Sequence, residues 1–174
     1  MATFEKERYL GTWYDIQHDF FIYFQWFQSC VMAEYEAVPD SDMISVRNSA
    51  YLFGWNGSSG FAVQADNGKD DASLVVELQD GMPSPSDRAN YTIMDSDYDT
   101  YSIVYSCESI WYGFASWENL WILAREPEIS DELLGTLADK IDETLPEYEF
   151  WENTIKTVQG EENCSYSDRP TDYE

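Results

Sequence analysis

The chain has 174 residues, 44% of them apolar and 17% aromatic, which can fill the core of one domain and excludes a disordered or fibrous protein. Lys and Arg number 9 against 34 Asp and Glu, so a net charge of -25 disfavours nucleic acid and anionic membrane surfaces as partners. The richest apolar stretch, residues 20–27, is shorter than the roughly 18 residues of a membrane span, so we expect a soluble protein without membrane insertion.

Short apolar or alternating segments, separated by turn residues about every 8 to 12 positions, predict an antiparallel all-β fold. Clusters of Pro, Asp, Asn, Gly and Ser mark turns at residues 39–42, 56–60, 67–71 and 81–86. The predicted strands cover residues 12–18, 29–38, 43–53, 60–66, 72–79, 89–95, 100–108 and 115–125. Eight such strands favour an up-and-down β-barrel.

One α-helix is expected after the strands, at residues 130–145. Ser130 is a suitable N-cap, leucine and isoleucine recur at helical spacing, and Pro146 ends the pattern. A short ninth strand at residues 149–158 and an acidic tail follow. Without internal repeats or linkers, we expect a single domain over residues 1–174, with the barrel at about residues 8–125 and the last strand and tail at 149–174.

Three cysteines lack the close pairs of zinc sites, so we expect no metal and one disulfide with one cysteine left over. Three N-x-[ST] sequons, at Asn56, Asn90 and Asn163, suit a secreted protein. The first residues carry no secretion signal, which suggests a mature form. The alternative is a cytosolic protein with three buried thiols.

Alternation also indicates which strand faces are dry. Val31, Ala33 and Tyr35 share one face, whereas Glu34 and Glu36 share the other. The inward face of an eight-stranded barrel is either filled by side chains or encloses one small ligand. Function therefore depends on which of the two occurs.

Three short motifs resemble those of the lipocalin family. They are Gly-Thr-Trp-Tyr at residues 11–14, Ser-Asp-Tyr at 96–98 and Arg125, in the family's order and at familiar separations. Further matches, at residues 9–14, 101–107 and 155–160, resemble the branch that contains the crustacyanin subunits and apolipoprotein D. The resemblance covers about residues 8–166 and implies an eight-stranded calyx that binds a ligand.

The resemblance gives structural roles to Gly11, Trp13, Asp97, Tyr98 and Arg125. It implies that the indole closes one end of the barrel beneath the guanidinium, a cation–π arrangement, and that the Asp-Tyr pair shapes the adjoining turn.

The same resemblance bears on the cysteines. It implies a disulfide between Cys30 and Cys164. The N-terminal cysteine that pairs with the position of Cys107 in this branch is absent, so we expect Cys107 to be free. Ser96 replaces the family's usual threonine and keeps its hydroxyl.

The long loop before the second strand, at residues 18–30, is rich in large apolar side chains that should line an entrance, cover a ligand or meet another subunit. The alternative is that the loop folds inward and fills the calyx. The predicted ligand-binding residues, from this loop and from the strands, are Phe20, Phe24, Gln25, Trp26, Phe27, Tyr35, Tyr51, Trp55, Phe61, Val63, Val76, Tyr105, Trp117 and Trp121.

Few basic residues lie in the strands and their turns, so a neutral hydrophobic ligand is favoured over a carboxylate. The crustacyanin resemblance implies a carotenoid, such as the xanthophyll astaxanthin, bound without covalent attachment. A bilin, a retinoid or another lipid are alternatives in the same class.

An enzyme is disfavoured because the chain has one histidine, His18, and no G-x-S-x-G or H-E-x-x-H motif. Haem binding by His18 is a weaker alternative than a hydrogen-bonded loop histidine.

A binder of cationic amines would need an inward carboxylate, and alternation places Glu34, Glu36 and Glu77 outward. The aromatic barrel mouth could also serve a homodimer or hetero-oligomer, which the high net charge opposes.

Overall fold

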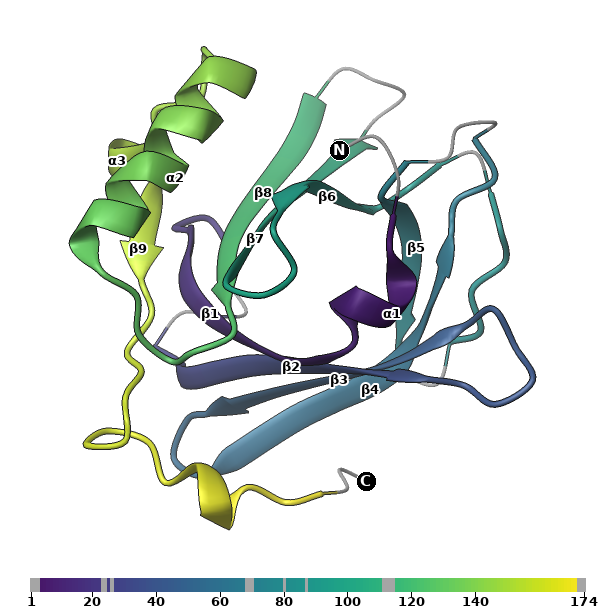
Figure 1. The fold of residues 1–174 in the computed structure, drawn as a ribbon, viewed down its shortest axis with the longest axis horizontal. Helices are drawn as coiled ribbons and strands as arrows, with labels where there is room; N and C mark the ends of the chain where they lie inside the picture. Colours follow the sequence, from purple (N-terminus) through teal and green to yellow (C-terminus); the bar gives the residue numbers. More distant parts are fainter. Residues whose placement is uncertain are drawn as a thin grey trace.

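A computed structural model of the chain describes residues 4–22, 25, 27–67, 71–79, 81–86, 88–110 and 115–171 (Figure 1). For residues 108–110 and 115–117 it describes the backbone alone. Among the described helices, none is long and apolar enough to cross a membrane.

Eight antiparallel strands form a closed up-and-down barrel in the described part of the chain, as predicted. They pair in chain order from β2 to β8 and then β1, and the additional pairing of β1 with β2 closes the ring. The short β9 pairs with β1 outside the ring. The strands are β1 (Gly11–Asp19), β2 (Ser29–Ala37), β3 (Ile44–Tyr51), β4 (Trp55–Gln64), β5 (Ser73–Leu78), β6 (Tyr91–Ser96), β7 (Tyr101–Ile110), β8 (Ala115–Ala124) and β9 (Thr154–Lys156).

The two ends of the barrel differ. The short helix α1 (Lys6–Tyr9) lies within the ring of strands in Figure 1 and directly precedes β1, so it marks what we call the closed end. Consecutive strands are antiparallel, so the β1–β2, β3–β4, β5–β6 and β7–β8 connections lie at the opposite end, which we call the open end.

Buried apolar side chains form two main cores. The interior core takes side chains from all eight barrel strands and from α1: Tyr9, Trp13, Ala33, Tyr35, Ile44, Val46, Ala62, Leu74, Ile93, Val104 and Leu123 are among its members. The outer core lies between the outside of β1, β7 and β8 and the helices α2 (Asp131–Thr144) and α3 (Phe150–Asn153), and includes Ile16, Ile103, Leu120, Ile122, Leu137 and Ile141. A strand residue in the interior core therefore points into the barrel, and one in the outer core points away from it.

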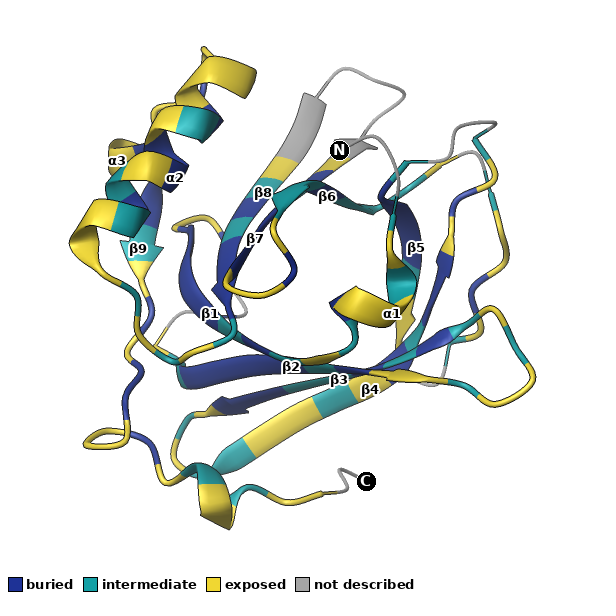
Figure 2. Cartoon of the chain, viewed as in Figure 1, coloured by how far each residue is buried: buried dark blue, intermediate teal, exposed yellow. Residues whose placement is uncertain are grey.

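Helix α2 forms where the sequence predicts it and stands beside the ring of strands (Figure 2). The Ser130 hydroxyl caps it by accepting a hydrogen bond from the Leu133 amide at 3.1 Å. Leu134, Leu137 and Ile141 are buried against the barrel, while the acidic residues of the other face are exposed. This helix covers the outer surface and leaves the interior to the strands.

The predicted turn at residues 56–60 is wrong, because β4 runs through it. The chain reverses at residues 52–54, where Phe53 and Gly54 have positive φ angles of 56° and 148°. The small residues serve strand packing: a Cβ on Gly60 would lie 2.0 Å from the carbonyl oxygen of Glu77 on β5. Two short helices also differ from the prediction, since α1 was not expected and α3 replaces the first part of the ninth strand.

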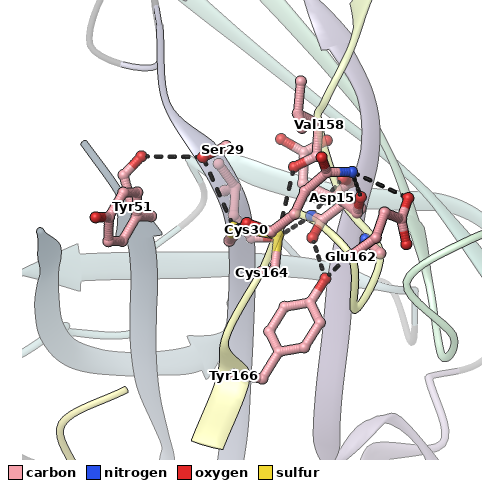
Figure 3. Close-up of a disulfide and its surroundings, with 12 residues drawn as sticks. Asp15, Ser29, Cys30, Tyr51, Val158, Glu162, Cys164 and Tyr166 are labelled. Atoms are coloured by element: carbon pink, nitrogen blue, oxygen red, sulfur yellow. Dashed lines mark hydrogen bonds between the residues drawn. A yellow bond between two sulfur atoms is a disulfide. The ribbon is translucent and has the colours of Figure 1, made fainter. Parts of the chain in front are cut away.

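A disulfide joins Cys30 on β2 to Cys164 in the C-terminal segment, as the resemblance implied (Figure 3). Beside it, the Cys30 amide donates to the Val158 carbonyl at 2.8 Å. Cys107 is not in a disulfide, as expected, and it is exposed. The disulfide links the C-terminal segment to β2, close to the point where the pairing between β1 and β2 ends.

Candidate ligand-binding site

The closed end is sealed by Trp13 and Arg125. The Trp13 indole is fully buried and donates to the Tyr9 carbonyl at 2.8 Å. The Arg125 guanidinium lies 3.7 Å from the ring centroid and donates to the carbonyls of Tyr98, Thr12 and Arg8 at 3.0, 2.9 and 2.7 Å. Cation–π contact and three charged hydrogen bonds thus fix this end.

The neighbouring motif residues support that seal. Gly11 has φ 96°, and a Cβ there would lie 3.3 Å from Nη1 of Arg125, so glycine suits both the backbone and the guanidinium. One carboxylate oxygen of Asp97 accepts from the amides of Asp99, Thr100 and Tyr101. These three bonds outweigh the opposing effect of burial and lower the pKa of Asp97. The structural roles that the resemblance implied match this geometry.

A chain of hydroxyl groups lies inside the barrel next to this seal. Tyr91 is hydrogen-bonded to Tyr9 at 3.0 Å and to Tyr35 at 2.9 Å, and Tyr9 also lies 3.3 Å from the Ser102 hydroxyl. Burial raises the pKa of Tyr9 to about 12 and raises the pKa values of Tyr35 and Tyr91 as well. The hydroxyls therefore stay protonated and give the interior a neutral, polar floor.

A second polar group lies further along β1. Between Asp15 and Gln17 the register of β1 against β8 shifts, so that Asp15 faces Leu123 and His18 faces Trp121. Leu123 belongs to the interior core and Trp121 packs against it, whereas Ile16 belongs to the outer core. The bulge therefore turns Asp15 and His18 into the barrel, although alternation would separate two residues three apart.

Asp15 and His18 form a buried pair, with exposed fractions of 2% and 1%. Nδ1 of His18 lies 2.8 Å from Oδ2 of Asp15 and 3.0 Å from the Thr157 hydroxyl. Burial lowers the pKa of His18, but the attraction and hydrogen bond of Asp15, with a smaller effect of Asp19, raise it above its usual value. Oδ1 of Asp15 and Nε2 of His18 have no hydrogen-bond partner among the described residues.

Gln25 connects the β1–β2 loop to this pair. Its side-chain oxygen accepts from the Trp121 indole at 3.1 Å, and its amide nitrogen lies 3.5 Å from Oδ2 of Asp15. Ile22 is fully buried in the same loop, whereas Phe20, Phe21 and Phe27 are exposed, Phe27 to 88%. In the described part of the loop, Ile22 and Gln25 thus point inward, whereas the three phenylalanine rings lie outside.

The structure brings four predicted ligand-binding residues together in the interior, namely Gln25, Tyr35, Val76 and Trp121. Phe20 and Phe27 lie exposed at the open end. Phe24 and Trp26 lie outside the described residues, as does the side chain of Trp117. Ligand contact by all of these residues stays a prediction.

Five other predicted residues do not face the interior. Tyr51 and Trp55 pack on each other, and Trp55 contacts Tyr166, whose ring in turn meets Tyr14 of the outer surface. The others are on the outward faces of β4 and β7: Phe61, Val63 and Tyr105. They were misplaced because apolar segments also cover the outside there; Val63, for example, packs with Met43 and Ala89. Alternation alone cannot orient a strand with two apolar faces.

The acidic strand residues lie outside, as alternation predicted. Glu36 and Glu77 are exposed. Glu34 accepts hydrogen bonds from Arg47 at 2.9 Å and from Arg169 at 2.8 Å, and these outweigh burial and lower its pKa. The buried Asp15–His18 pair was missed. Its one signal was a lone histidine three residues after an aspartate in a strand that otherwise carries the family motif.

Comparison with known proteins identifies the family. The sequence profile described as "Lipocalin-like domain" matches residues 4–159. Curated relatives include apolipoprotein D of Bos taurus, 27% identical over 95% of this chain and 81% of its own length. Another is the Lazarillo protein of Schistocerca americana, 31% identical over 92% of this chain and 75% of its own length.

Solved structures with the same fold include lobster apocrustacyanin A1 and insecticyanin from the tobacco hornworm Manduca sexta. The first has a TM-score of 0.74 and 20% identity over 95% of this chain and 84% of its own. The second has a TM-score of 0.76 and 19% identity over 96% of this chain and 87% of its own.

Proposed function

Because this chain belongs to the lipocalin family, in the branch with apolipoprotein D and crustacyanin, we propose that it is a non-enzymatic carrier of a small, neutral, hydrophobic ligand. The ligand is held inside the barrel without covalent attachment. Among the described residues, no group of His, Cys, Asp or Glu is arranged to hold a metal ion.

One observation carries this proposal: side chains on the inward face keep accessible surface. Tyr91, Val76 and Trp121 pack against the interior core yet are only partly buried. Because these three residues belong to the inward face of their strands, we infer that part of this surface lines a space within the ring. Covering about 400 Å² of an apolar ligand at roughly 25 cal/mol per Å² yields on the order of 10 kcal/mol before the costs of association.

The charges of the wall favour a neutral ligand. Of the described basic residues of the barrel, Arg47 is paired with Glu34 on the outside and Arg125 seals the closed end. A ligand carboxylate inside would therefore find few cations and a strongly negative protein around it. Together with the crustacyanin resemblance, this supports a carotenoid of the xanthophyll class, with a bilin, a retinoid or another lipid as alternatives.

A titration tests the proposal directly. Zeaxanthin, a dihydroxylated carotenoid, is added in a mild detergent to purified protein while pigment absorption and tryptophan fluorescence are followed. We expect an altered absorption band and quenching that saturates at one ligand per chain. Unchanged spectra at saturating pigment, with retinol and a bilin also failing to bind, would contradict it.

A carrier of cationic amines is a second candidate, because Asp15 is an inward carboxylate with one oxygen that no described residue pairs with. Against it, the other oxygen of this carboxylate is already occupied by Nδ1 of His18, at 2.8 Å. Calorimetry with a panel of biogenic amines separates the two functions. Micromolar binding of an amine, abolished by Asp15→Asn, would favour the amine carrier.

We also infer that the protein is secreted. The Cys30–Cys164 disulfide supports this, since structural disulfides persist in oxidising compartments. Reducing and non-reducing electrophoresis of protein from its native source tests it: a faster-migrating non-reduced form is expected, and a fully reduced chain would contradict secretion.

Assembly through the open end remains a further prediction. The exposed rings of Phe20, Phe21 and Phe27 offer an apolar surface there, and the net charge of -25 opposes self-association at low salt. Sedimentation at low and high salt tests it. A dimer that appears as salt rises is the expected result, and a monomer at every salt concentration would contradict assembly.

A further inference from the structure

The buried pair of Asp15 and His18 is not explained by the fold. Polar atoms that are shielded from water are nearly always hydrogen-bonded in folded proteins, so an unpaired one calls for a reason. Oδ1 of Asp15 and Nε2 of His18 are unpaired within the described part of the chain, although both side chains are almost completely buried. Poor local packing does not explain the two unpaired atoms, because the other polar groups around Asp15 and His18 have hydrogen-bond partners.

The hydrogen bonds around Asp15 and His18 show that β1 is well ordered here. The Gln159 side chain donates to the carbonyls of Asp15 and Val31 at 2.9 and 2.6 Å. On the outer face of the same strand, Gln17 donates to the Thr154 hydroxyl at 2.6 Å. The strand is thus hydrogen-bonded along its backbone and on its outer face, whereas its two inward polar side chains each keep one atom that meets no partner in the described part of the chain.

The orientation of the pair is fixed from one side. Nδ1 of His18 faces both Oδ2 of Asp15 and the Thr157 hydroxyl, so the imidazole cannot turn without losing two contacts. Nε2, on the opposite side of the ring, is therefore presented away from these contacts. His18 faces Trp121 across the β1–β8 ladder, and Trp121 is one of the partly accessible side chains of the interior.

We propose that the Asp15–His18 pair is the subsite that binds a hydroxyl group of an uncharged, lipophilic ligand, with Nε2 of His18 as the primary contact and Oδ1 of Asp15 as the second contact. This inference rests on the proposed function, and it names the polar group by which the ligand is selected.

A hydroxyl fits because it can both donate and accept a hydrogen bond. Neutral His18 with its proton on Nδ1 presents Nε2 as an acceptor, and protonated His18 presents it as a donor. A hydroxyl can meet Nε2 in either state. With protonated His18 it accepts from Nε2 and donates its one proton to Oδ1 of Asp15, which has no partner among the described residues, whereas with neutral His18 it donates that proton to Nε2. A hydrocarbon end would leave both atoms unpaired.

The charges disfavour the alternatives. A ligand carboxylate would meet the Asp15 carboxylate, and an ammonium group would meet a histidine that Asp15 keeps more basic than usual. Tyr148 donates to Asp19 at 2.9 Å on the outer side of β1, so that carboxylate has its own partner. A hydrogen-bonded carboxylate and imidazole therefore suit a neutral dipolar group better than either ion.

The experiment uses two ligands with the same carbon skeleton, zeaxanthin and β-carotene, of which the first alone carries ring hydroxyls. The dissociation constants of both are measured for the wild-type chain and for two variants. In His18→Asn the amide nitrogen takes the place of Nδ1 and the atom corresponding to Nε2 is lost. In His18→Gln the amide nitrogen takes the place of Nε2, which makes this variant the matched control.

We expect zeaxanthin to bind the wild type about tenfold or more tightly than β-carotene, the ratio that one hydrogen bond to a buried polar group provides. His18→Asn should lose this preference, and His18→Gln should keep most of it. The affinity for β-carotene should be the same in all three proteins. Equal binding of both ligands, unchanged by His18→Asn, would overturn the subsite and leave the carrier function standing.

A second measurement needs no variant. His18 is the single histidine of the chain, so protein labelled with ¹⁵N-histidine and purified without a histidine tag gives one pair of ring signals. Zeaxanthin should shift the Nε2 signal and β-carotene should not. An unmoved Nε2 signal with bound zeaxanthin would show that water or nothing meets this atom, and would overturn the inference. Failure of both ligands to bind would instead overturn the carotenoid function, and the subsite with it.

Discussion

The closed end of the barrel and the Asp15–His18 pair are both polar groups set among apolar side chains, but they differ in how completely they are paired. At the closed end, Arg125 meets three carbonyls and the face of Trp13. In the interior of β1, Asp15 and His18 pair with each other and each keeps an atom without a partner in the described chain.

This difference separates a structural role from a binding role. Paired polar groups stabilise one conformation and gain nothing from a ligand, whereas an unpaired buried group costs stability until something meets it. The closed end should therefore govern the free energy of unfolding, and the Asp15–His18 pair should govern ligand choice. The following predictions test that division, from the largest effect to the smallest.

Removing the disulfide should have the largest effect. The bond joins residues 134 positions apart, and the chain-entropy model assigns about 5 kcal/mol to a loop of that length. Chemical denaturation of Cys30→Ser/Cys164→Ser should show a loss of this order. Cys107→Ser is the control and should change little, because Cys107 is exposed and unbridged. A loss below about 1 kcal/mol would mean that the C-terminal segment is held by its other contacts.

Trp13→Ala should cost about 3 to 5 kcal/mol, because it removes a fully buried indole and the surface on which Arg125 rests. Trp151→Ala is the matched control, since Trp151 is 60% exposed, and should cost under about 1 kcal/mol. Similar losses in the two variants, measured by urea unfolding, would contradict a stabilising role of the closed end.

Arg125→Lys should cost about 2 kcal/mol, because an ammonium group cannot reach three carbonyls at once and stack on the indole. The exposed Arg88→Lys serves as control and should be neutral. Both variants should keep the wild-type preference among ligands. A changed preference in Arg125→Lys would break the division between the two regions.

The pH dependence of His18 should be the smallest effect. Asp15 and Thr157 contact the ring, Trp121 lies opposite it across the β1–β8 ladder, and Asp19 acts on it electrostatically from the outer side of β1. Because the pKa of His18 is raised in the folded state, its protonation stabilises the fold fully below the unfolded pKa of about 6.5, and this contribution disappears as pH rises through the folded pKa.

Unfolding measured from pH 6 to pH 9 should thus show a decline in stability that Asp15→Asn removes. The ¹⁵N signals of the single histidine give the pKa independently. A pKa at or below the usual histidine value would mean that burial outweighs the Asp15 carboxylate, and the decline should then be absent.

Much of the fold could be predicted from local patterns. The helix at Asp131–Thr144 follows from a capping serine and helical spacing, and the orientation of the second half of β2, residues 33–36, follows from alternation. Phe61 and Val63 could not be oriented, since both faces of β4 are covered by apolar groups near them. The small residues at 57–60 suggested a turn because close strand packing requires the same residue types.

The sequence by itself determined the family, the barrel and the closed end, because their signals are short motifs whose residues act where they stand in the chain. Only the tertiary structure decided that Asp15 and His18 share the interior. β1 pairs with β2, β8 and β9, and the shift in its register against β8 at Ile16 breaks the alternation that the sequence would otherwise impose. A bulge depends on how the neighbouring strands align, so it leaves no mark in the residues of one strand.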